Sequence, residues 1–269
     1  MYISSSSFSY RLLSGLLFCL LIACRNEADS NNQYVNKWIG TGLEGRVAPV
    51  ASVPFGMMQI GADTRPYGAG YHYDDPSILG FSHLHKSGGG CADFLDILFM
   101  PLPLNSGMAD EELYSKQYQA VLSHKDEKAE PGYYSVGLYD KQLTVELTAS
   151  RRCGLQRYTY ASEGEIPVIV DLKYGSESAC TIQSEHDVDT VYASAFEWVD
   201  PYTVRGYRCS NGWTPGQQVY FYSTFSSPIK ECVLYVDDRR LEGMTSAEGT
   251  NIKALLTFES NTGELEVRT

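Results

Sequence analysis

The sequence predicts an all-β protein that folds as one β-sandwich. Runs of five to seven residues recur from residue 118 to the end, and turn signals such as Pro131-Gly132 and Asn211-Gly212 separate them. Within one run, Leu143–Ala149, apolar and polar residues alternate, as expected of a strand with one buried face. Outside the N-terminal segment no run keeps helical periodicity over three turns, although residues 108–117 could form a short helix. Many short strands at close spacing favour a sandwich.

The chain begins with a predicted targeting segment. Arg11 precedes an apolar run, Leu12–Ala23, whose dozen or so residues are too few for a membrane-spanning helix of roughly 20. The run closes on Leu21-Ile22-Ala23-Cys24, which resembles the lipobox of bacterial lipoproteins. We therefore expect a signal peptide over residues 1–23, lipidation of Cys24 and a flexible tether over residues 24–33. A plain secretory signal with a chance cysteine is the alternative.

Lipidation of Cys24 implies an exported lipoprotein attached to a membrane. Its expected location is the periplasm or the outer-membrane surface of a Gram-negative bacterium. The 21 basic and 33 acidic residues give a net charge of −12, which argues against a nucleic-acid partner because there is no cationic surplus to displace counterions. A neutral substrate such as a sugar is compatible with this charge. The cysteines after Cys24 are widely spaced, and their spacing dictates no disulfide.

Residues 34–269 are expected to form one domain. A short buried strand is predicted at Asp96–Met100, where Pro101 and Pro103 stop it. Ten later runs have the length and pattern of strands: Tyr133–Leu138, Leu143–Ala149, Leu155–Tyr160, Pro167–Asp171, Val191–Phe196, Thr203–Arg208, Val219–Thr224, Cys232–Val236, Lys253–Phe258 and Glu264–Arg268.

The stretch Gly70–Pro101 is the best candidate for a functional site. It holds three of the five histidines, four aspartates and the triplet Gly88–Gly90, a mixture that is poor core material. The glycines let the main chain approach a ligand closely or reverse tightly. Because a polar, glycine-rich loop carried by a buried strand commonly presents a site, we expect ligand binding here.

The histidines and the cysteine of this stretch have competing explanations. His83 and His85 with Cys91 could bind a transition metal, but no fourth ligand is evident, so we expect no metal site. Recognition of sugar hydroxyls by the two histidines is favoured, and histidines bonded internally to hold the loop are the alternative. His72 is expected to be packed or turn-bonded. Cys91 has no evident base partner and is expected to line the loop.

The acidic and aromatic residues also have structural explanations. Asp74 and Asp75 precede a proline, so an Asx-turn accounts for them. We expect Asp96 to accept hydrogen bonds from loop N–H groups, whereas Asp93 is open between that role and contact with a sugar. Both Trp198 and Trp213 are expected to pack in the core.

Several segments resemble the N-terminal domain of glycoside hydrolase family 92. Ala69–Asp74, Gly80–Cys91 and Asp93–Pro101 are similar to the family's SGYHYxD, GFSHTHLSGxGC and DxGDILxMP. Upstream, Trp38–Gly42 and Val53–Gln59 are similar to its IGTG and PFGMVQ. Further matches are Ser123–Tyr134 to HxxExxxPGYY, Leu147–Ser150 to LTATxR, and Arg157-Tyr158 to hRY, so the resemblance covers nearly all of the mature chain.

The resemblance implies a galactose-mutarotase-like (supersandwich) β-sandwich in a calcium-dependent exo-α-mannosidase. In that family a helical (α/α)6 domain follows, and it holds the two proton-transfer carboxyl groups and most calcium contacts. Residues 264–269 look like the last strand before that domain, so a natural fragment and a truncated gene model are both open. The resemblance therefore assigns no catalytic residue and no calcium ligand to this chain, and it implies the helical domain as a partner.

The resemblance also implies which residues contact α-mannoside glycans. The expected substrate-binding residues are Tyr67, Tyr71, His83, His85, Ser87, Gly90, Cys91 and Asp93.

Some positions depart from the family pattern. Tyr67 lies near the place of a tryptophan that many members carry, and Leu43–Val50 replaces their Gly-His-Gly-His-Thr-Phe-Pro-Gly loop. Lys86 and Leu95 replace a usual Leu and Gly. A different linkage, or a modified mannose reached by Arg46 or Lys86, therefore stays open.

Two functions of different class follow from the sequence. The first is the substrate-binding half of an exported exo-α-mannosidase, inactive as this fragment. The second is a stand-alone carbohydrate-binding or structural module of the cell surface.

Overall fold

The computed structural model describes residues 31–89, 93–106, 118–175 and 189–269. It comprises two compact units, Met1–Val35 and Asn36–Thr269. The described part of the first unit is a 3-10 turn, η1 (Asn31–Tyr34). The predicted signal peptide, Cys24, Gly90, Cys91 and the short helix at 108–117 lie outside the described residues. In the described ranges, no helix is long and apolar enough to cross a membrane.

The second unit is built almost entirely of strands. Its first strands are short: β1 (Gly61–Asp63), β2 (Ser77–Ile78), β3 (Gly80–Ser82), β4 (Leu98–Pro101) and β5 (Ala120–Val121). Longer ones follow: β6 (Glu127–Glu130), β7 (Tyr133–Leu138), β8 (Leu143–Ala149), β9 (Gly154–Tyr160), β10 (Gly164–Asp171), β11 (Thr190–Asp200), β12 (Thr203–Asn211), β13 (Gln217–Phe225), β14 (Ile229–Val236), β15 (Arg239–Leu241), β16 (Ser246–Gly249), β17 (Ile252–Ser260) and β18 (Glu264–Arg268). The 3-10 turns η2 (His124–Asp126) and η3 (Tyr139–Lys141) lie beside β6 and β8.

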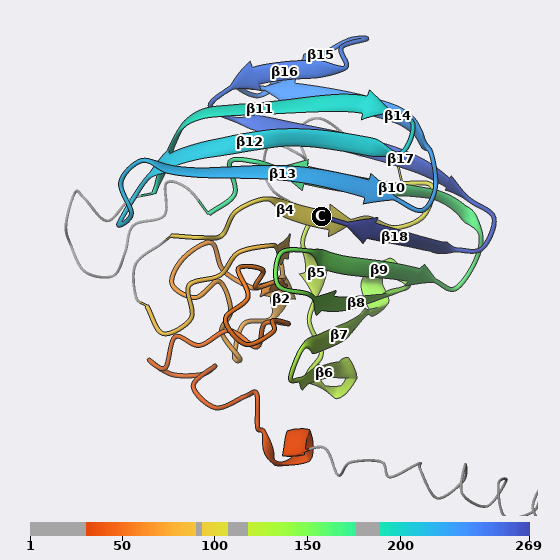
Figure 1. The fold of residues 1–269 in the computed structure, drawn as a ribbon. Coiled ribbons are helices and arrows are strands. Elements are labelled where there is room, and N and C mark those ends of the chain that lie inside the picture. Colours follow the sequence, from red (N-terminus) through yellow and green to blue (C-terminus); the bar gives the residue numbers. More distant parts are fainter. Residues whose placement is uncertain (1–30, 90–92, 107–117, 176–188) are drawn as a thin grey trace, which may run out of the picture. The chain divides into compact units, whose positions relative to one another are not determined.

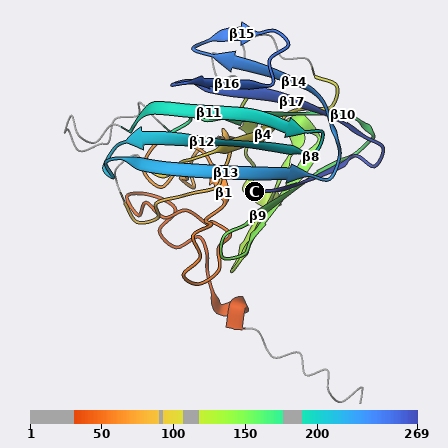
Figure 2. The same cartoon turned by 45° about the horizontal axis from the view of Figure 1, so that its top comes forward.

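Two large sheets form the sandwich that the sequence predicts. One has seven strands in the order β1-β3-β4-β10-β17-β14-β15, and the other has nine in the order β16-β11-β12-β13-β18-β9-β8-β7-β6. A small pair, β2 and β5, stands apart from both. Strands β11, β12 and β13 run side by side, with β14 and β17 of the other sheet behind them (Figures 1 and 2). The all-β prediction is confirmed.

The strand pattern follows from which faces are buried. β8 alternates buried and exposed residues, because the nine-stranded sheet buries one face and exposes the other. β10 is buried on both faces from Ile166 to Asp171, between β4 and β17. Each fully buried Val, Leu, Ile or Phe side chain in such strands contributes about 1.5–3 kcal/mol relative to an exposed one. The apolar surface between the sheets therefore holds the fold together.

The nine-stranded sheet has a seam between β13 and β18. The two strands share two residue pairs, Thr224 with Arg268 and Phe225 with Val267. Farther back along β13, Gln217 to Ser223 pair with β12 on one edge, and their other edge has no partner strand in the described sheet. An unpaired edge leaves backbone groups available to whatever lies beside it.

One of the two tryptophan predictions is wrong. Trp198 is half-buried against the core, as expected. Trp213 is 59% exposed, because it lies in the turn between β12 and β13 rather than on a strand face. The described cysteines Cys153, Cys209 and Cys232 are free thiols.

Candidate substrate-binding site

The glycine-rich stretch is the connection between β3 and β4. β1, β3 and β4 lie side by side, with Ala62 opposite Phe81 and Phe81 opposite Phe99. Where the stretch leaves β3, the His83 amide donates to the Asp96 carbonyl and the His83 carbonyl accepts from the Gln59 amide, each at 3.1 Å. These bonds fasten both ends of the connection at one end of the seven-stranded sheet.

His83 supports the connection from below. It is buried, its Nδ1 donates to the Ile97 carbonyl at 2.7 Å, and its Nε2 accepts from the Gln156 amide nitrogen at 3.2 Å. Both contacts suit a neutral ring, and burial lowers the pKa of His83 to about 4. The histidine is therefore neutral and holds the connection through two internal hydrogen bonds.

His85 lies two residues later, and its surroundings favour the protonated ring. Nδ1 donates to the Gln59 carbonyl at 2.8 Å, and Nε2 lies 3.2 Å from Asp63 Oδ1 and 3.3 Å from Ser82 Oγ. Burial opposes protonation of the ring, but the Asp63 carboxylate and the Gln59 carbonyl outweigh burial and raise the pKa of His85. Both histidines thus hold the loop internally, which is the alternative that the sequence left open.

A buried ionic cluster lies under the second half of the connection. Arg208 of β12 is 1% exposed and binds the carboxylates of both Asp96 and Asp189. Asp96 also accepts from Gln217 Nε2 at 2.7 Å. Asp96 is therefore an internal acceptor, but its donors are side chains of β12 and β13 rather than the loop N–H groups that we expected.

Asp93 ties the connection to the β12–β13 turn. It is 1% exposed, and its Oδ2 accepts from the Thr214 amide at 3.0 Å. A second contact joins the same loop and turn nearer the protein surface, where Lys86 Nζ lies 3.5 Å from the ring centroid of Trp213 in a cation–π arrangement. Two contacts, one buried and one exposed, therefore hold this turn against the glycine-rich loop.

The acidic pair before Pro76 behaves differently from a simple Asx-turn. The Asp75 amide donates to the His72 carbonyl, but the Asp75 carboxylate binds Arg65 at 2.8 Å and Thr64 at 2.6 Å. Burial opposes its ionisation, yet these two hydrogen bonds lower the pKa of Asp75. His72 accepts from the Asp74 amide, so the prediction of a turn-bonded histidine is confirmed.

Two cavities adjoin the connection. The smaller, about 250 Å³, is lined by Leu43, Glu44, Arg46, Arg65, Tyr67, Gly68, Ala69, Tyr71 and His72. The larger, about 580 Å³, is lined by Met57, Gln59, Leu84, His85, Lys86, Ser87, Phe94, Gln217, Gln218 and Val219. We call them the Tyr67 cavity and the Ser87 cavity. The Gly88 amide donates to the Arg46 carbonyl, so the loop that lines the second touches the segment that lines the first.

The predicted site residues divide between these cavities and the interior. Tyr67 and Tyr71 line the Tyr67 cavity, whereas His85 and Ser87 line the Ser87 cavity. His83 and Asp93 line neither and are buried beneath the loop. Exposed Ser87 accepts from the Ala48 amide at 3.3 Å, which leaves its hydroxyl hydrogen free to be donated.

Large apolar side chains are exposed around the two cavities. Leu43 and Met57, which line them, are 86% and 60% exposed, and nearby Phe55 is fully exposed at the tip of a turn. Exposed apolar side chains of this size in loops bordering a cavity commonly mark an interaction surface.

Known proteins resemble this chain in sequence and in fold. The model of the glycosyl hydrolase family 92 N-terminal domain matches residues 34–269. The chain belongs to this family. A secreted, otherwise uncharacterized glycosidase of Arthroderma benhamiae is 30% identical over 174 residues, which is 61% of this chain and 22% of the relative.

Solved structures of the family share the fold of this family 92 domain. An α-mannosidase of Bacteroides thetaiotaomicron, in complex with mannoimidazole, is 29% identical with a TM-score of 0.75 over 89% of this chain and 32% of its own. A second structure of the same enzyme gives a TM-score of 0.76. An inverting mannosidase of the same organism is 24% identical with a TM-score of 0.70, which shows likeness of fold. The chain thus spans about a third of the length of these enzymes.

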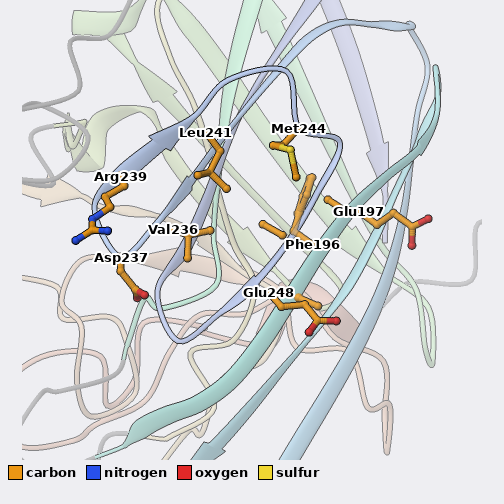
Figure 3. Close-up of a pocket in the computed structure, with 11 residues that line it drawn as sticks. Phe196, Glu197, Val236, Asp237, Arg239, Leu241, Met244 and Glu248 are labelled. Carbon is orange, nitrogen blue, oxygen red and sulfur yellow. The ribbon is translucent and has the colours of Figure 1, made fainter.

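A larger cavity, among the described residues of the family 92 domain, lies elsewhere. It measures about 950 Å³ between β11, β16 and the β14–β15 hairpin, and Figure 3 shows Phe196 and Met244 facing Val236 and Leu241 across it. It contains none of the residues that the sequence singled out. The candidate site is the loop, because exposed Ser87 of the loop and exposed Gln218 of β13 both line the Ser87 cavity.

The described residues of this family 92 domain offer no metal site. Across the described ranges, no group of three or more His, Cys, Asp or Glu side chains is arranged to hold an ion. Asp96 and Asp189 share Arg208 as their counter-ion.

Sequence reasoning missed the contribution of β13. Gln217 and Gln218 line the Ser87 cavity although they lie more than a hundred residues after Ser87. The available signal was a pair of amide side chains directly after Gly216, at the start of an apolar strand. Their place beside the loop depends on sheet order, which periodicity does not specify.

Proposed function

We propose that this family 92 domain is the substrate-binding part of an exported exo-α-mannosidase that hydrolyses terminal α-mannosides of glycans. The observation that carries the proposal is the pair of cavities around the β3–β4 connection, in a chain whose family relatives include α-mannosidases. The residues proposed to contact the glycan are Tyr67, Ser87, Gly90 and Cys91, whereas Tyr71, His83, His85 and Asp93 are buried and are proposed to hold the segments that border the cavities.

Tyr67 and Ser87 are the proposed direct contacts among the described residues. The Tyr67 ring is 36% exposed with Arg65 5.2 Å from its centroid, so one face is fixed from behind and the rest is open to a sugar. The Ser87 hydroxyl can donate to a sugar oxygen. Hydrolysis needs one carboxyl group to protonate the leaving oxygen and another to activate water. We assign neither role within this chain and propose that a helical domain supplies both, together with bound calcium.

Activity measurements test this proposal. The 269-residue chain and a version extended by a family 92 helical domain should be compared on p-nitrophenyl α-mannoside and α-mannobiose. We expect turnover from the extended protein only. Tyr67→Ala in that protein should lower kcat/KM about tenfold or more, as loss of about 1.4 kcal/mol of binding implies, while Tyr139→Ala, exposed on η3, should not change it. His85→Ala should also lower kcat/KM, through the loop that it holds.

Three results would overturn the proposal. One is mannosidase turnover by the 269-residue chain alone. Another is an extended protein that folds and hydrolyses other glycosides but no α-mannoside. The third is a correctly folded Tyr67→Ala enzyme with unchanged kinetics. Glycan binding by the short chain, without hydrolysis by any extended form, would favour a stand-alone carbohydrate-binding module.

We also propose that the protein is exported and anchored through a lipid on Cys24. The support is the lipobox-like run ending at Cys24 and the secreted relative. Several acyl chains hold a protein firmly on a membrane, whereas one holds it weakly. Wild-type protein should enter the detergent phase in Triton X-114 partitioning and incorporate labelled palmitate. Cys24→Ala should remain in the aqueous phase, and unchanged partitioning of that variant would refute the anchor.

A further inference from the structure

The outward face of β13 carries a row of exposed side chains. Gln218, Tyr220 and Tyr222 occupy alternate positions and therefore point to the same side of the sheet. Tyr220 is 69% exposed and Tyr222 56% exposed. Tyr207 of β12 lies opposite Tyr220, with their ring centroids 5.8 Å apart and their planes inclined by 50°. Together, Tyr207, Tyr220 and Tyr222 form what we call the tyrosine platform.

We propose that the tyrosine platform binds further sugar residues of a neutral glycan whose end lies in the Ser87 cavity. The proposal rests on the proposed function for the identity of the glycan as an α-mannan. It goes beyond that function in assigning a second, extended binding surface on the sheet face.

The platform is continuous with the Ser87 cavity. Three consecutive residues, Gln217, Gln218 and Val219, line that cavity. Because consecutive strand residues point to opposite faces, the cavity must border an edge of β13, and β12 occupies the other edge. Gln218 links the cavity to the platform: it lines the Ser87 cavity, and its Oε1 accepts from the Tyr220 hydroxyl at 3.2 Å. Alternate residues of a strand are about 6.6 Å apart, so Gln218, Tyr220 and Tyr222 form a track leading out of the cavity.

The charges around the platform favour a neutral ligand. Arg205, opposite Tyr222, binds Glu197 of β11 at 2.7 and 2.8 Å, so these two charges neutralise each other. Glu248, whose charge acts on Tyr207, adds a negative charge that disfavours anions. The chain as a whole carries a charge of −12, which repels polyanions. A polymer recognised here must instead combine apolar faces for stacking with many hydroxyl groups, which describes a glycan chain.

The tyrosines suit that chemistry. Each ring offers a flat apolar face for the C–H side of a sugar and a hydroxyl for hydrogen bonding. The rings stand on paired strands rather than on loops, so little conformational entropy is lost when a ligand binds. Neighbouring exposed aromatic rings bordered by polar groups are also typical of an interaction surface.

Affinity electrophoresis of the 269-residue chain tests the proposal. Native gels are cast with yeast α-mannan, with oat β-glucan or without polysaccharide. We expect mannan to retard the wild-type chain and Tyr220→Ala/Tyr222→Ala to weaken its affinity at least about tenfold. Tyr220→Phe/Tyr222→Phe should keep most of the affinity because the rings remain, and Tyr139→Ala, an equally exposed tyrosine on η3, should be unaffected. Equal melting temperatures will show that the variants are folded.

A second measurement avoids substitution altogether. Nitration of the wild-type chain by tetranitromethane, read by mass spectrometry, should slow at Tyr220 and Tyr222 when mannan is present, and should not slow at Tyr139. Unchanged nitration of the platform at saturating mannan would overturn the proposal.

The remaining outcomes separate the platform from the proposed function. Retardation by β-glucan but not by α-mannan would support glycan binding by the platform and contradict the assignment of the ligand as an α-mannoside. Retardation by mannan that survives Tyr220→Ala/Tyr222→Ala would keep the mannoside assignment and overturn the platform. Sedimentation that shows a dimer broken by the double alanine variant would assign this face to a second copy of the chain, and would also overturn it.

Discussion

At the scale of single residues, His83 and His85 are two positions apart and have opposite charge preferences. Hydrogen bonds to a carbonyl and from an amide keep His83 neutral. His85 instead faces a carbonyl and the Asp63 carboxylate, which favour the imidazolium. The end of β3 is therefore followed by one imidazole that favours the neutral form, His83, and one that favours the protonated form, His85.

These preferences predict how stability depends on pH. The pKa of His83 is lowered to about 4, against about 6.5 in an unfolded chain. Because the unfolded chain takes up this proton more readily, the free energy of unfolding should fall by about 3 kcal/mol as pH falls from 6.5 to 4. The pKa of His85 is raised in the folded protein, so protonated His85 stabilises the fold below pH 6.5. This stabilisation is lost as pH rises through the folded pKa. Urea denaturation across pH 4–8 should show His83→Gln flattening the acid side relative to wild type. An identical slope in both proteins would contradict the assignment.

Gly70 shows how closely the loop is packed. Its φ is +80°, and a β-carbon there would lie 2.6 Å from both Asp63 Oδ1 and Leu95 Cδ2 and 3.1 Å from His85. Gly68 has a similar φ of +64° with nothing within 4 Å, which makes it a matched control. Each alanine costs about 1–2 kcal/mol for the left-handed backbone, and Gly70→Ala should cost about 1–3 kcal/mol more for overpacking. Equal unfolding free energies in Gly68→Ala and Gly70→Ala would show that the loop is loosely packed.

At the scale of elements, β12 supplies the counter-ion for the β3–β4 connection. Arg208 is buried between Asp96 and Asp189, and burial is outweighed by those carboxylates, which raise the pKa of the guanidinium. The loop and the nine-stranded sheet are thereby joined by buried charge rather than by apolar contact alone.

Removing this counter-ion should be costly. Arg208→Met leaves two buried carboxylates without their counter-ion and should lower the free energy of unfolding by about 3–5 kcal/mol. Arg205→Met, three residues earlier on the same strand, removes an exposed ion pair and should cost under about 1 kcal/mol. Adding Asp96→Asn to Arg208→Met should restore part of the loss. Chemical denaturation of the three variants measures these differences, and equal costs for the two arginines would contradict the buried cluster.

The long strands were largely predictable, and the short ones were not. Tyr133–Leu138, Leu143–Ala149 and Glu264–Arg268 have the predicted bounds, because alternation over five or more residues reports a half-buried face. β1 and β3 have three residues each and are buried throughout, so they show no alternation. The loop residues Phe94 and Ile97 adopt φ of +66° and +59°, which their residue types do not signal.

At the scale of the whole second unit, the candidate site depends on sheet order. The histidine-containing loop was evident from composition, but its partners Arg208, Gln217 and Trp213 come from a hairpin more than a hundred residues away. No local pattern gives the pairing of distant strands, so the sequence indicated one wall of the site and missed the other. The burial of His83 against Gln156 of β9 follows from the same cause.

The seam between β13 and β18 predicts uneven amide protection. Residues 217–223 of β13 have a partner strand on one edge, whereas residues 203–210 of β12 have one on each edge. About half of the amides in that part of β13 should exchange with deuterium at least about tenfold faster than those of β12. Hydrogen exchange with mass spectrometry or NMR measures this, and glycan in the Ser87 cavity should reduce the difference. Uniform protection across both strands would show that the edge is covered.

The exposed apolar side chains Leu43, Phe55 and Met57 should let molecules of this protein attract one another at short range. At low ionic strength its charge of −12 keeps molecules apart, because repulsion then extends about 30 Å at 0.01 M salt. At 1 M salt that range falls to about 3 Å, and exposed apolar side chains of two molecules can meet. The osmotic second virial coefficient from light scattering should therefore decrease as sodium chloride is added, and Phe55→Ser should make the decrease shallower.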